Sequence, residues 1–422
     1  MSRVKNLMDG KICSMDFSCV HPDEVMKIIG QLSNSTAFGL DNIDTYIIKL
    51  IKEEITPALT HIINLSLRHN TYPEKWKSSK VVPLYKKDDP LNPKNYRPVA
   101  LIPVLSKVLE RVVSQQIIQY LSKNNILNPN HHAYRSKHNT STAMIQMVNS
   151  WAEALESGEM AGVCLLDMSA AFDIVNHDIL LQKMTLYGFE ENIISWLRSY
   201  LTNRKQCVSI NGSLSKLLPL SSGVPQGSIL GPLLYSIFTN DLPEVIEKDR
   251  NQSICCYADD TTHTSTNRDH TALSKLLSEN YTKISDYMRE NQLKLNDDKT
   301  HLVVISTQNS SKKTLEADLV RIVTPTKIIA PSSSEKLLGC WIQSNLKWTE
   351  YMRDSENNLF KSLTKRISAI QLISKYSDFK TRKMLADGIF MSKLIYLTCA
   401  WSSCPRTYFY TFRLFKIKQL GW

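Results

Sequence analysis

Several features are absent from this 422-residue sequence. Its nine cysteines are scattered and form no C-x-x-C pair, which argues against a disulfide scaffold and against a zinc site of the usual spacing. No stretch of about 18 uncharged apolar residues occurs, and the N-terminal segment MSRVKNLMDGK carries no apolar signal region. No internal repeat is present either. These absences predict a reduced, soluble, intracellular protein without a membrane span.

The charge of the chain is unevenly distributed. The net charge is +11, and residues 351–422 contain 13 Lys and Arg against 4 Asp and Glu, so this segment carries +9 of the total. Such a basic block with helical patterning is typical of a surface that binds a polyanion. Charge alone leaves a second interpretation equally open, in which the block is a solvated face.

Length and patterning together predict a mixed α+β protein with two or three subdomains. Apolar residues at helical spacing begin after Pro103, and further helices are expected at 178–188, 190–201, 271–291, 357–373 and 380–395. Strands are expected at 162–166, 301–306 and 336–342, and a hairpin is expected at 205–220 around Asn211-Gly212.

Two adjacent acids interrupt the segment ICCYADDTTH at 254–263. If 253–257 pairs with 261–265, Asp259 and Asp260 lie at the tip of a hairpin, and Asp167 ends another strand in GVCLLDMSAAFD. Carboxylates that converge at strand ends suit Mg²⁺, a hard cation that prefers oxygen ligands. An isolated Asp-Asp pair is more often a polar turn.

Two further segments have a composition that suits a nucleotide. SSGVPQGSILGPLLYSIF (221–238) is a loop rich in glycine and proline before an apolar helix, and glycine permits close approach of a ligand to the backbone. LYKKDDPLNPKNYRPVAL (84–101) contains cations that suit a triphosphate. In isolation, the first segment is also explained by a simple turn and the second by a solvated basic loop.

The order of these segments resembles the reverse transcriptases of non-LTR (LINE-type) retrotransposons, from about residue 20 to beyond residue 400. Each block is weak or moderate alone, whereas the ordered set is highly specific. The blocks are NYRPVALIPVLSKVLER (95–111), HHAYRSKHNTSTAM (131–144), LLDMSAAFD (165–173), GVPQGSILGPLL (223–234), YADD (257–260), LKLNDDKT (293–300) and EKLLGCWIQSNLKW (335–348).

The resemblance implies a right-hand polymerase of fingers, palm and thumb, working in the cytoplasm and nucleus. We expect an N-terminal helical extension at 1–75, fingers and palm at 76–350, and a basic helical thumb at 351–422. The expected activity is RNA-directed DNA synthesis with an RNA template, a DNA primer and dNTPs. The oligomeric state is left open.

The resemblance also implies roles for individual residues. Asp167, Asp259 and Asp260 would ligate two Mg²⁺ ions, and Lys299 would protonate the departing pyrophosphate. The remaining expected roles are triphosphate binding, exclusion of a ribose 2′-hydroxyl, contact with the nascent base pair and grip on the primer end. Lys86 and Arg97 would bind the triphosphate, and Phe172 would exclude the 2′-hydroxyl. Gln226 and Gly227 would contact the nascent base pair, and the hairpin 337–342 would grip the primer end.

Some positions depart from the family pattern. His132 and Ala133 stand where a glutamine and a glycine are common, although Arg135 is retained. The polymerase blocks begin soon after the N-terminus and the chain ends soon after the basic helices, so we expect a fragment or truncated copy of a longer element. Two alternatives are an RNA-dependent RNA polymerase, which Phe172 argues against, and a non-catalytic nucleic-acid-binding relic, which the intact acids argue against.

Overall fold

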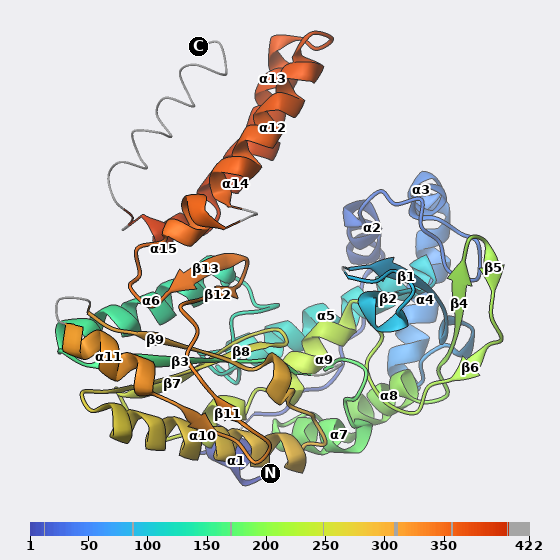
Figure 1. Ribbon diagram of the computed structural model, residues 1–422. Helices are drawn as coiled ribbons and strands as arrows, with labels where there is room; N and C mark the ends of the chain where they lie inside the picture. The colour runs from blue at the N-terminus through green and yellow to red at the C-terminus, as the bar shows by residue number, and fades with distance from the viewer. Residues whose placement is uncertain are drawn as a thin grey trace. The chain divides into compact units, whose positions relative to one another are not determined.

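A computed structural model describes residues 1–404, apart from 12, 87, 169–170, 248, 308–310, 356–357 and 403 (Figure 1). The chain divides into two compact units. Unit 1 comprises Met1–Tyr134, Ser169–Val245 and Tyr287–Lys294, and unit 2 comprises Arg135–Met168, Ile246–Asp286 and Leu295–Trp422. Each unit therefore combines separate stretches of chain. No described helix is both long enough and apolar enough to cross a bilayer.

Helices make up most of unit 1. The α-helices are α1 (Ser2–Met8), α2 (Pro22–Gln31), α3 (Thr45–Leu50), α4 (Lys52–Arg68), α5 (Val104–Lys123), α7 (His177–Leu186), α8 (Glu191–Leu201) and α9 (Leu230–Phe238). Short 3₁₀ turns are η1 (Glu74–Trp76), η2 (Pro93–Asn95) and η3 (Leu242–Val245). The helices predicted after Pro103, at 178–188 and at 190–201 are thus confirmed as α5, α7 and α8.

One small sheet completes unit 1. Its strands are β1 (Ser78–Tyr85), β2 (Tyr96–Leu101), β4 (Lys205–Ile210), β5 (Ser213–Leu214) and β6 (Leu218–Pro219), in the order β2-β1-β4-β5 with β6 also paired to β4. Asn211 and Gly212 have φ of 49° and 84° between β4 and β5. Because an Asn-Gly pair tolerates two consecutive positive φ angles, it forms the two-residue turn that the sequence predicts.

Two buried carboxylates fix the ends of α9, the helix that follows the loop at 221–229. Glu110 accepts hydrogen bonds from the backbone N–H groups of Ile229 and Leu230, at 2.8 and 3.2 Å. These donors lack partners within the helix, so the carboxylate acts as a cap. Beyond the other end, Asp241 pairs with Lys183 of α7 at 2.6 Å, and both side chains are 1% exposed. The loop before α9 is therefore held on a rigid support.

A four-stranded sheet forms the centre of unit 2. Its order is β7-β8-β3-β9, with β7 (Gln252–Tyr257), β8 (Asp260–Asn267), β3 (Met160–Leu166) and β9 (His301–Ile305). Strand β3 is antiparallel to both neighbours. Helices α6 (Thr140–Glu156) and α10 (His270–Glu290) contribute buried side chains that contact this sheet. Trp151 of α6 donates to Thr264 at 3.1 Å, and a Cβ at Gly162 would lie 2.6 Å from Leu277 of α10.

Hairpins and C-terminal helices complete unit 2. They are α11 (Ser311–Leu319), β10 (Ile322–Val323), β11 (Ile328–Ile329), β12 (Ser334–Leu337), β13 (Cys340–Gln343), the π-helix η5 (Glu350–Asp354), α12 (Leu359–Ser374), α13 (Phe379–Leu385), the π-helix η6 (Ala386–Met391), α14 (Ser392–Ile395) and α15 (Thr398–Trp401). Apolar residues from α12 onward join one core with α6 and the sheet. The predicted helical character of 351–422 is confirmed where the structure describes it; residues 405–422 lie outside the described part.

The single strand predicted at 336–342 is wrong. This segment forms the β12–β13 hairpin, in which Leu337 pairs with Cys340. Leu338 and Gly339 form the turn with φ of 48° and 81°. An apolar leucine at the turn makes the sequence look like one continuous strand, although Gly339 supplies the usual turn residue. The hairpin implied by the family resemblance is present.

Candidate active site

The β7–β8 hairpin carries the adjacent acids at the end of the unit 2 sheet. Tyr257 pairs with Asp260, so Asp260 is already the first residue of β8 and the loop consists of Ala258 and Asp259 alone. Both aspartates are exposed. Ala258 has φ of 55°, a left-handed conformation that is uncommon for a residue with a Cβ. Strained backbone of this kind is often found at functional sites.

Asp167 lies beside this hairpin in the register of the sheet. The last pair between β3 and β8 is Leu166 with Thr261, and one further step brings Asp167 level with Asp260. Opposed residues of an antiparallel pair share a face, with Cα atoms about 4.5–5.5 Å apart. Asp167 is 42% exposed. The strand pairing therefore brings Asp167, Asp259 and Asp260 to one end of the sheet.

Lys299 lies next to one of these acids, Asp167. Its Nζ lies 3.7 Å from Oδ2 of Asp167. It ends the 3₁₀ turn η4 (Asp297–Lys299), and the preceding Asn296 donates its N–H to the Asp167 carbonyl at 3.0 Å. The segment that carries Asp167 and the turn η4, which are distant in sequence, are thus joined by one backbone hydrogen bond and one side-chain ion pair. The lysine partly balances the negative charge of the carboxylates.

Asp297 anchors the same turn and was missed by sequence reasoning. Its carboxylate accepts hydrogen bonds from Tyr281 of α10 and from Thr324 and Thr326 in the loop of the β10–β11 hairpin. Burial alone would raise the pKa of Asp297, but the hydrogen bonds from Thr326, Tyr281 and Thr324 lower it overall. The Asp297 carboxylate therefore stays ionised, and its hydrogen bonds fix the start of the turn η4 that ends at Lys299.

The end of the unit 2 sheet that carries Asp167, Asp259 and Asp260 is called the carboxylate end below. Its ligand atoms suit a hard divalent cation. Asp167, Asp259 and Asp260 offer oxygen ligands only, which are the ligands that Mg²⁺ prefers. Among the described residues, no three His, Cys, Asp or Glu side chains lie close enough together to hold a metal ion. The residue types and their strand positions fit a magnesium site, whereas a preformed three-ligand cage is not present there.

Unit 1 carries the other residues predicted from the resemblance. Phe172 is half-buried and its ring lies 4.7 Å from the ring of Tyr235 in α9, with the planes tilted by 33°. The Phe172 carbonyl accepts a hydrogen bond from the N–H of Val224 at 2.8 Å. Tyr235 is fully buried, so it forms a fixed support for the partly exposed ring.

Lys86 and Arg97 lie on one face of the β1–β2 hairpin. Leu84 pairs with Arg97, and the N–H of Lys86 bonds the carbonyl of Asn95 at 2.9 Å, so the pairing continues by two residues. Because opposed residues share a face and alternate residues repeat it, both cations project from the same side. Both are exposed. Lys86 and Arg97 are therefore diagonal neighbours across the two strands.

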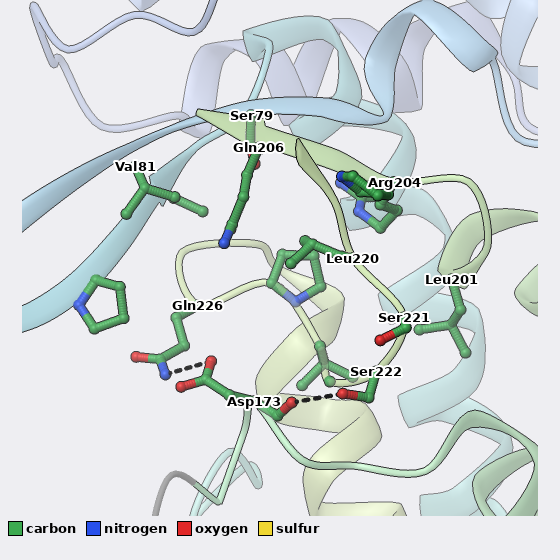
Figure 2. Close-up of a pocket in the computed structure, with 16 residues that line it drawn as sticks. Ser79, Val81, Asp173, Leu201, Arg204, Gln206, Leu220, Ser221, Ser222 and Gln226 are labelled. Atoms are coloured by element: carbon green, nitrogen blue, oxygen red, sulfur yellow. Dashed lines mark hydrogen bonds between the residues drawn. The ribbon is translucent and has the colours of Figure 1, made fainter. Parts of the chain in front are cut away.

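Gln226, which precedes Gly227, lines a cavity of about 260 Å³ in unit 1 (Figure 2). The Ala100 N–H donates to the Gln226 carbonyl at 2.6 Å. Gly227 has φ of +117°, and a Cβ there would lie 2.4 Å from the Ala100 carbonyl oxygen. Glycine is therefore required for the loop to lie against β2. The side-chain amide of Gln226 donates to Asp173 at 2.9 Å.

Arg204 lines the same cavity. Its side chain is 2% exposed, and Nη1 donates to the Tyr200 carbonyl at 3.0 Å. The guanidinium lies 4.9 Å from the centre of the Tyr200 ring, within the range of a cation–π contact. Nη2 has no hydrogen-bond partner among the described residues.

The predicted site residues thus form two groups. Asp167, Asp259, Asp260 and Lys299 lie at one end of the unit 2 sheet, where Lys299 contacts Asp167. Lys86, Arg97, Phe172, Gln226 and Gly227 belong to unit 1, where the first two share a hairpin face and the last two share a loop beside the Phe172 segment.

Residues 84–342, well over half of the chain, match a family described as reverse transcriptase (RNA-dependent DNA polymerase). The chain belongs to this family. The predicted site residues of this reverse transcriptase, from Lys86 to Lys299, all lie within the matched range. The resemblance noted from the motif order is confirmed.

Curated relatives of the reverse transcriptase are named for mobile elements of Drosophila melanogaster. The RNA-directed DNA polymerase from mobile element jockey is 34% identical over 59% of this chain and 28% of its own length. The probable RNA-directed DNA polymerases from transposon BS and transposon X-element are each 26% identical, over 83% and 86% of this chain. This chain covers 38% and 39% of their lengths. It therefore spans less than two fifths of each of these relatives.

Proposed function

We propose that this chain is the polymerase portion of a non-LTR retrotransposon reverse transcriptase, which extends a DNA primer on an RNA template with dNTPs. The proposal rests on the arrangement of charged residues at one end of the unit 2 sheet. At this end, Asp167 is level with Asp260 in the strand register, and Nζ of Lys299 lies 3.7 Å from the carboxylate of Asp167. Acids beside one lysine suit phosphoryl transfer, because they combine metal ligands with a proton donor.

Asp167, Asp259 and Asp260 would hold two Mg²⁺ ions. Bound there, the ions would lower the pKa of the primer 3′-hydroxyl and stabilise the charge of the leaving pyrophosphate. Carboxylate ligands leave other positions in the magnesium shell for phosphate oxygens and water. Removal of one carboxylate would therefore remove charge stabilisation that is needed mainly in the transition state.

The other residues act on the reacting groups directly. The 3′-hydroxyl gives its proton to water and its oxygen forms a bond to the α-phosphorus of the dNTP, while the bond from that phosphorus to the bridging oxygen breaks. Lys299 donates a proton to the departing pyrophosphate. Lys86 and Arg97 bind the triphosphate through charge-assisted hydrogen bonds. Phe172 occupies the space of a 2′-hydroxyl, and Gln226 and Gly227 lie over the nascent base pair.

The right-hand architecture is part of the same proposal. The β7-β8-β3-β9 sheet corresponds to the palm, and the β1–β2 hairpin with its cations corresponds to the fingers. Residues 351–422 correspond to the thumb, and residues 1–75 form an N-terminal extension. The support for this assignment is the position of each predicted residue on the element that the family would use.

Primer extension tests the function. Purified chain is incubated with a DNA primer on an RNA template, dNTPs and Mg²⁺, and the products are resolved by length. We expect template-dependent extension that requires both dNTPs and the divalent cation. Extension by ribonucleotides in preference to dNTPs, or no extension by a folded protein that binds the primer–template, would contradict the proposal.

A further inference from the structure

Asp173 has no role in the mechanism above, yet it contacts a residue that does. It immediately follows Phe172, and its Oδ1 accepts a hydrogen bond from Nε2 of Gln226 at 2.9 Å (Figure 2). Its backbone carbonyl accepts a second bond from the hydroxyl of Ser222 at 3.2 Å. One residue thus touches both the start and the tip of the loop at 221–227.

The backbone of this loop is fixed independently of the Asp173 carboxylate. Val224 and Gly223 donate to the carbonyls of Phe172 and Val175, at 2.8 and 2.9 Å. A Cβ on Gly223 would lie 2.5 Å from the Asp173 carbonyl oxygen, so the two segments pack backbone against backbone. The freedom that remains in Gln226 lies in its side-chain torsions, including the rotation of its terminal amide.

A carboxylate removes that freedom. An ionised carboxylate only accepts hydrogen bonds, whereas an amide end presents a donor NH₂ on one side and an acceptor oxygen on the other. Against Asp173 only the NH₂ side is favourable, because the flipped amide would place oxygen against oxygen. Figure 2 shows the consequence, with the amide oxygen of Gln226 directed away from Asp173. Without the carboxylate, the terminal torsion of a glutamine is broad and roughly two-fold.

We propose that Asp173 is a positioning residue of the polymerase, which fixes the amide of Gln226 so that its oxygen is presented as an acceptor to a hydrogen-bond donor of the paired nucleotide. This inference rests on the proposed function, since it assumes that Gln226 contacts the nascent base pair. Asp173 is an exposed residue at the cavity rim, and partial burial of its carboxyl raises its pKa overall, against the opposing effect of the Gln226 hydrogen bond.

The test measures steady-state incorporation of one dNTP by Asp173→Asn. This substitution keeps the shape of the side chain but offers both a donor and an acceptor to Gln226, so the amide is free to flip. We expect KM for the dNTP to rise roughly fivefold, the scale of one neutral hydrogen bond of about 1 kcal/mol, with kcat changed less than about twofold. Asp178→Asn, at an exposed carboxylate of α7 in the same unit, is the matched control and should leave KM unchanged.

A reciprocal exchange separates positioning from general support. In Asp173→Asn/Gln226→Glu the introduced amide donates to the introduced carboxylate, which again presents an oxygen acceptor on its outer side. We expect the double variant to recover most of the lost kcat/KM, although Gln226→Glu alone would place two carboxylates together and be impaired. Thermal unfolding of every variant shows whether the fold is intact.

The outcomes are distinct. A normal KM in Asp173→Asn, a lower unfolding temperature without a change in KM, or no recovery in the double variant overturns the inference. If Gln226→Ala is impaired and Asp173→Asn is normal, the inference fails and the proposed function stands. If the wild-type chain does not extend a primer, or Gln226→Ala behaves as wild type, the assigned function or the role of Gln226 fails, and the inference fails with it.

Discussion

Phe172 determines the choice of sugar in the proposed mechanism. Its ring is supported by the buried Tyr235, so it is held in one place beside the segment that follows β3. A 2′-hydroxyl facing this ring would lose its water without gaining a partner, which costs about 1–3 kcal/mol before steric overlap is added. Since about 1.4 kcal/mol is tenfold in rate, Phe172→Val should lower the ratio of kcat/KM for dNTP over rNTP at least tenfold.

Phe172→Tyr serves as the control for this prediction, because it retains the ring. It should keep the discrimination of the wild type. If the wild-type chain already uses ribonucleotides efficiently, or if Phe172→Val leaves the ratio unchanged, Phe172 is not the gate and the RNA polymerase alternative is favoured.

His263 makes the stability of unit 2 depend on pH. Its ring is buried in β8, with Nδ1 3.1 Å from the Ser253 carbonyl oxygen and Nε2 2.9 Å from the Ser265 hydroxyl. Burial lowers the pKa of His263 from 6.5 to about 4. The unfolded chain therefore binds the proton first, so stability is full above pH 6.5 and is lost as the pH falls toward 4. The loss attributable to this group is about 3 kcal/mol.

Denaturant unfolding at pH 7 and pH 5 measures this effect. His263→Gln should show a smaller decrease in unfolding free energy between the two values than the wild type shows. His61→Gln, at an exposed histidine of α4, should retain the full decrease. Equal decreases in all three proteins would remove His263 as the cause.

A buried ion pair links α7 to the segment that follows α9 in unit 1. Lys183 donates to Asp241 at 2.6 Å and to the Phe238 carbonyl at 2.7 Å, with both charged side chains 1% exposed. Burial lowers the pKa of Lys183, while the charge of Asp241 raises it. Lys183→Met would leave a buried carboxylate without its cation, and we expect a loss of about 3–5 kcal/mol in unfolding free energy.

The exposed pair of Arg198 and Asp178 is a matched comparison in the same unit. Its nitrogen and oxygen lie 3.2 Å apart, but the side chains are 55% and 76% exposed. Arg198→Ala should therefore cost less than about 1 kcal/mol. Similar losses in Lys183→Met and Arg198→Ala, measured by urea unfolding, would show that burial of the first pair contributes nothing extra.

Elements with clear periodicity were predictable from the sequence. Strand β3, helices α5, α7, α8 and α10, and the Asn211-Gly212 turn agree with the expectations, because each is determined by local patterning. The β12–β13 hairpin was missed as a local structure, since its turn contains a leucine at positive φ. Register between distant strands has no local signal, so the level of Asp167 with Asp260 came only from the structure.

The candidate site was predictable as residues but not as contacts. Asp167, Asp259 and Lys299 were assigned from ordered motifs, and the structure adds the distance from the lysine to one of these acids. Asp297 carries no motif signal of its own beside Asp298, because its role depends on hydroxyl donors 16 to 29 residues away. Asp173 was visible as an acid after Phe172, but its contact with Gln226 spans 53 residues.

At the scale of the whole molecule, the basic C-terminal segment should determine how binding depends on salt. Exposed cations cluster around the junction of α12 and α13, at Lys375, Lys380, Arg382 and Lys383. Apolar residues of the same helices belong to the core of unit 2, so charge neutralisation is a cleaner test than deletion. Replacing the four cations by glutamine should weaken primer–template binding. It should also reduce the slope of the logarithm of the association constant, log K, against log[salt].

The slope should fall by roughly 0.7 to 0.9 for each phosphate contact that is lost. Lys275→Gln, at an exposed lysine of α10, is a control outside this cluster and should leave the slope unchanged. Fluorescence anisotropy over a range of salt concentrations provides the measurement. An unchanged slope in the fourfold variant would mean that these cations form only a solvated face.

Single-turnover incorporation of one dNTP on an RNA template, compared between the wild type and Asp259→Asn, tests the central claim most directly. Asp259 is exposed in the two-residue loop between β7 and β8, so the substitution changes a charge without opening the core. The variant should lose at least 100-fold in the rate of incorporation, about 3 kcal/mol of transition-state stabilisation, while it binds primer–template as tightly as the wild type. Asp318→Asn, at an exposed acid of α11, should react at the wild-type rate. Wild-type incorporation by a folded Asp259→Asn protein would contradict the assignment of this carboxylate end as the catalytic centre.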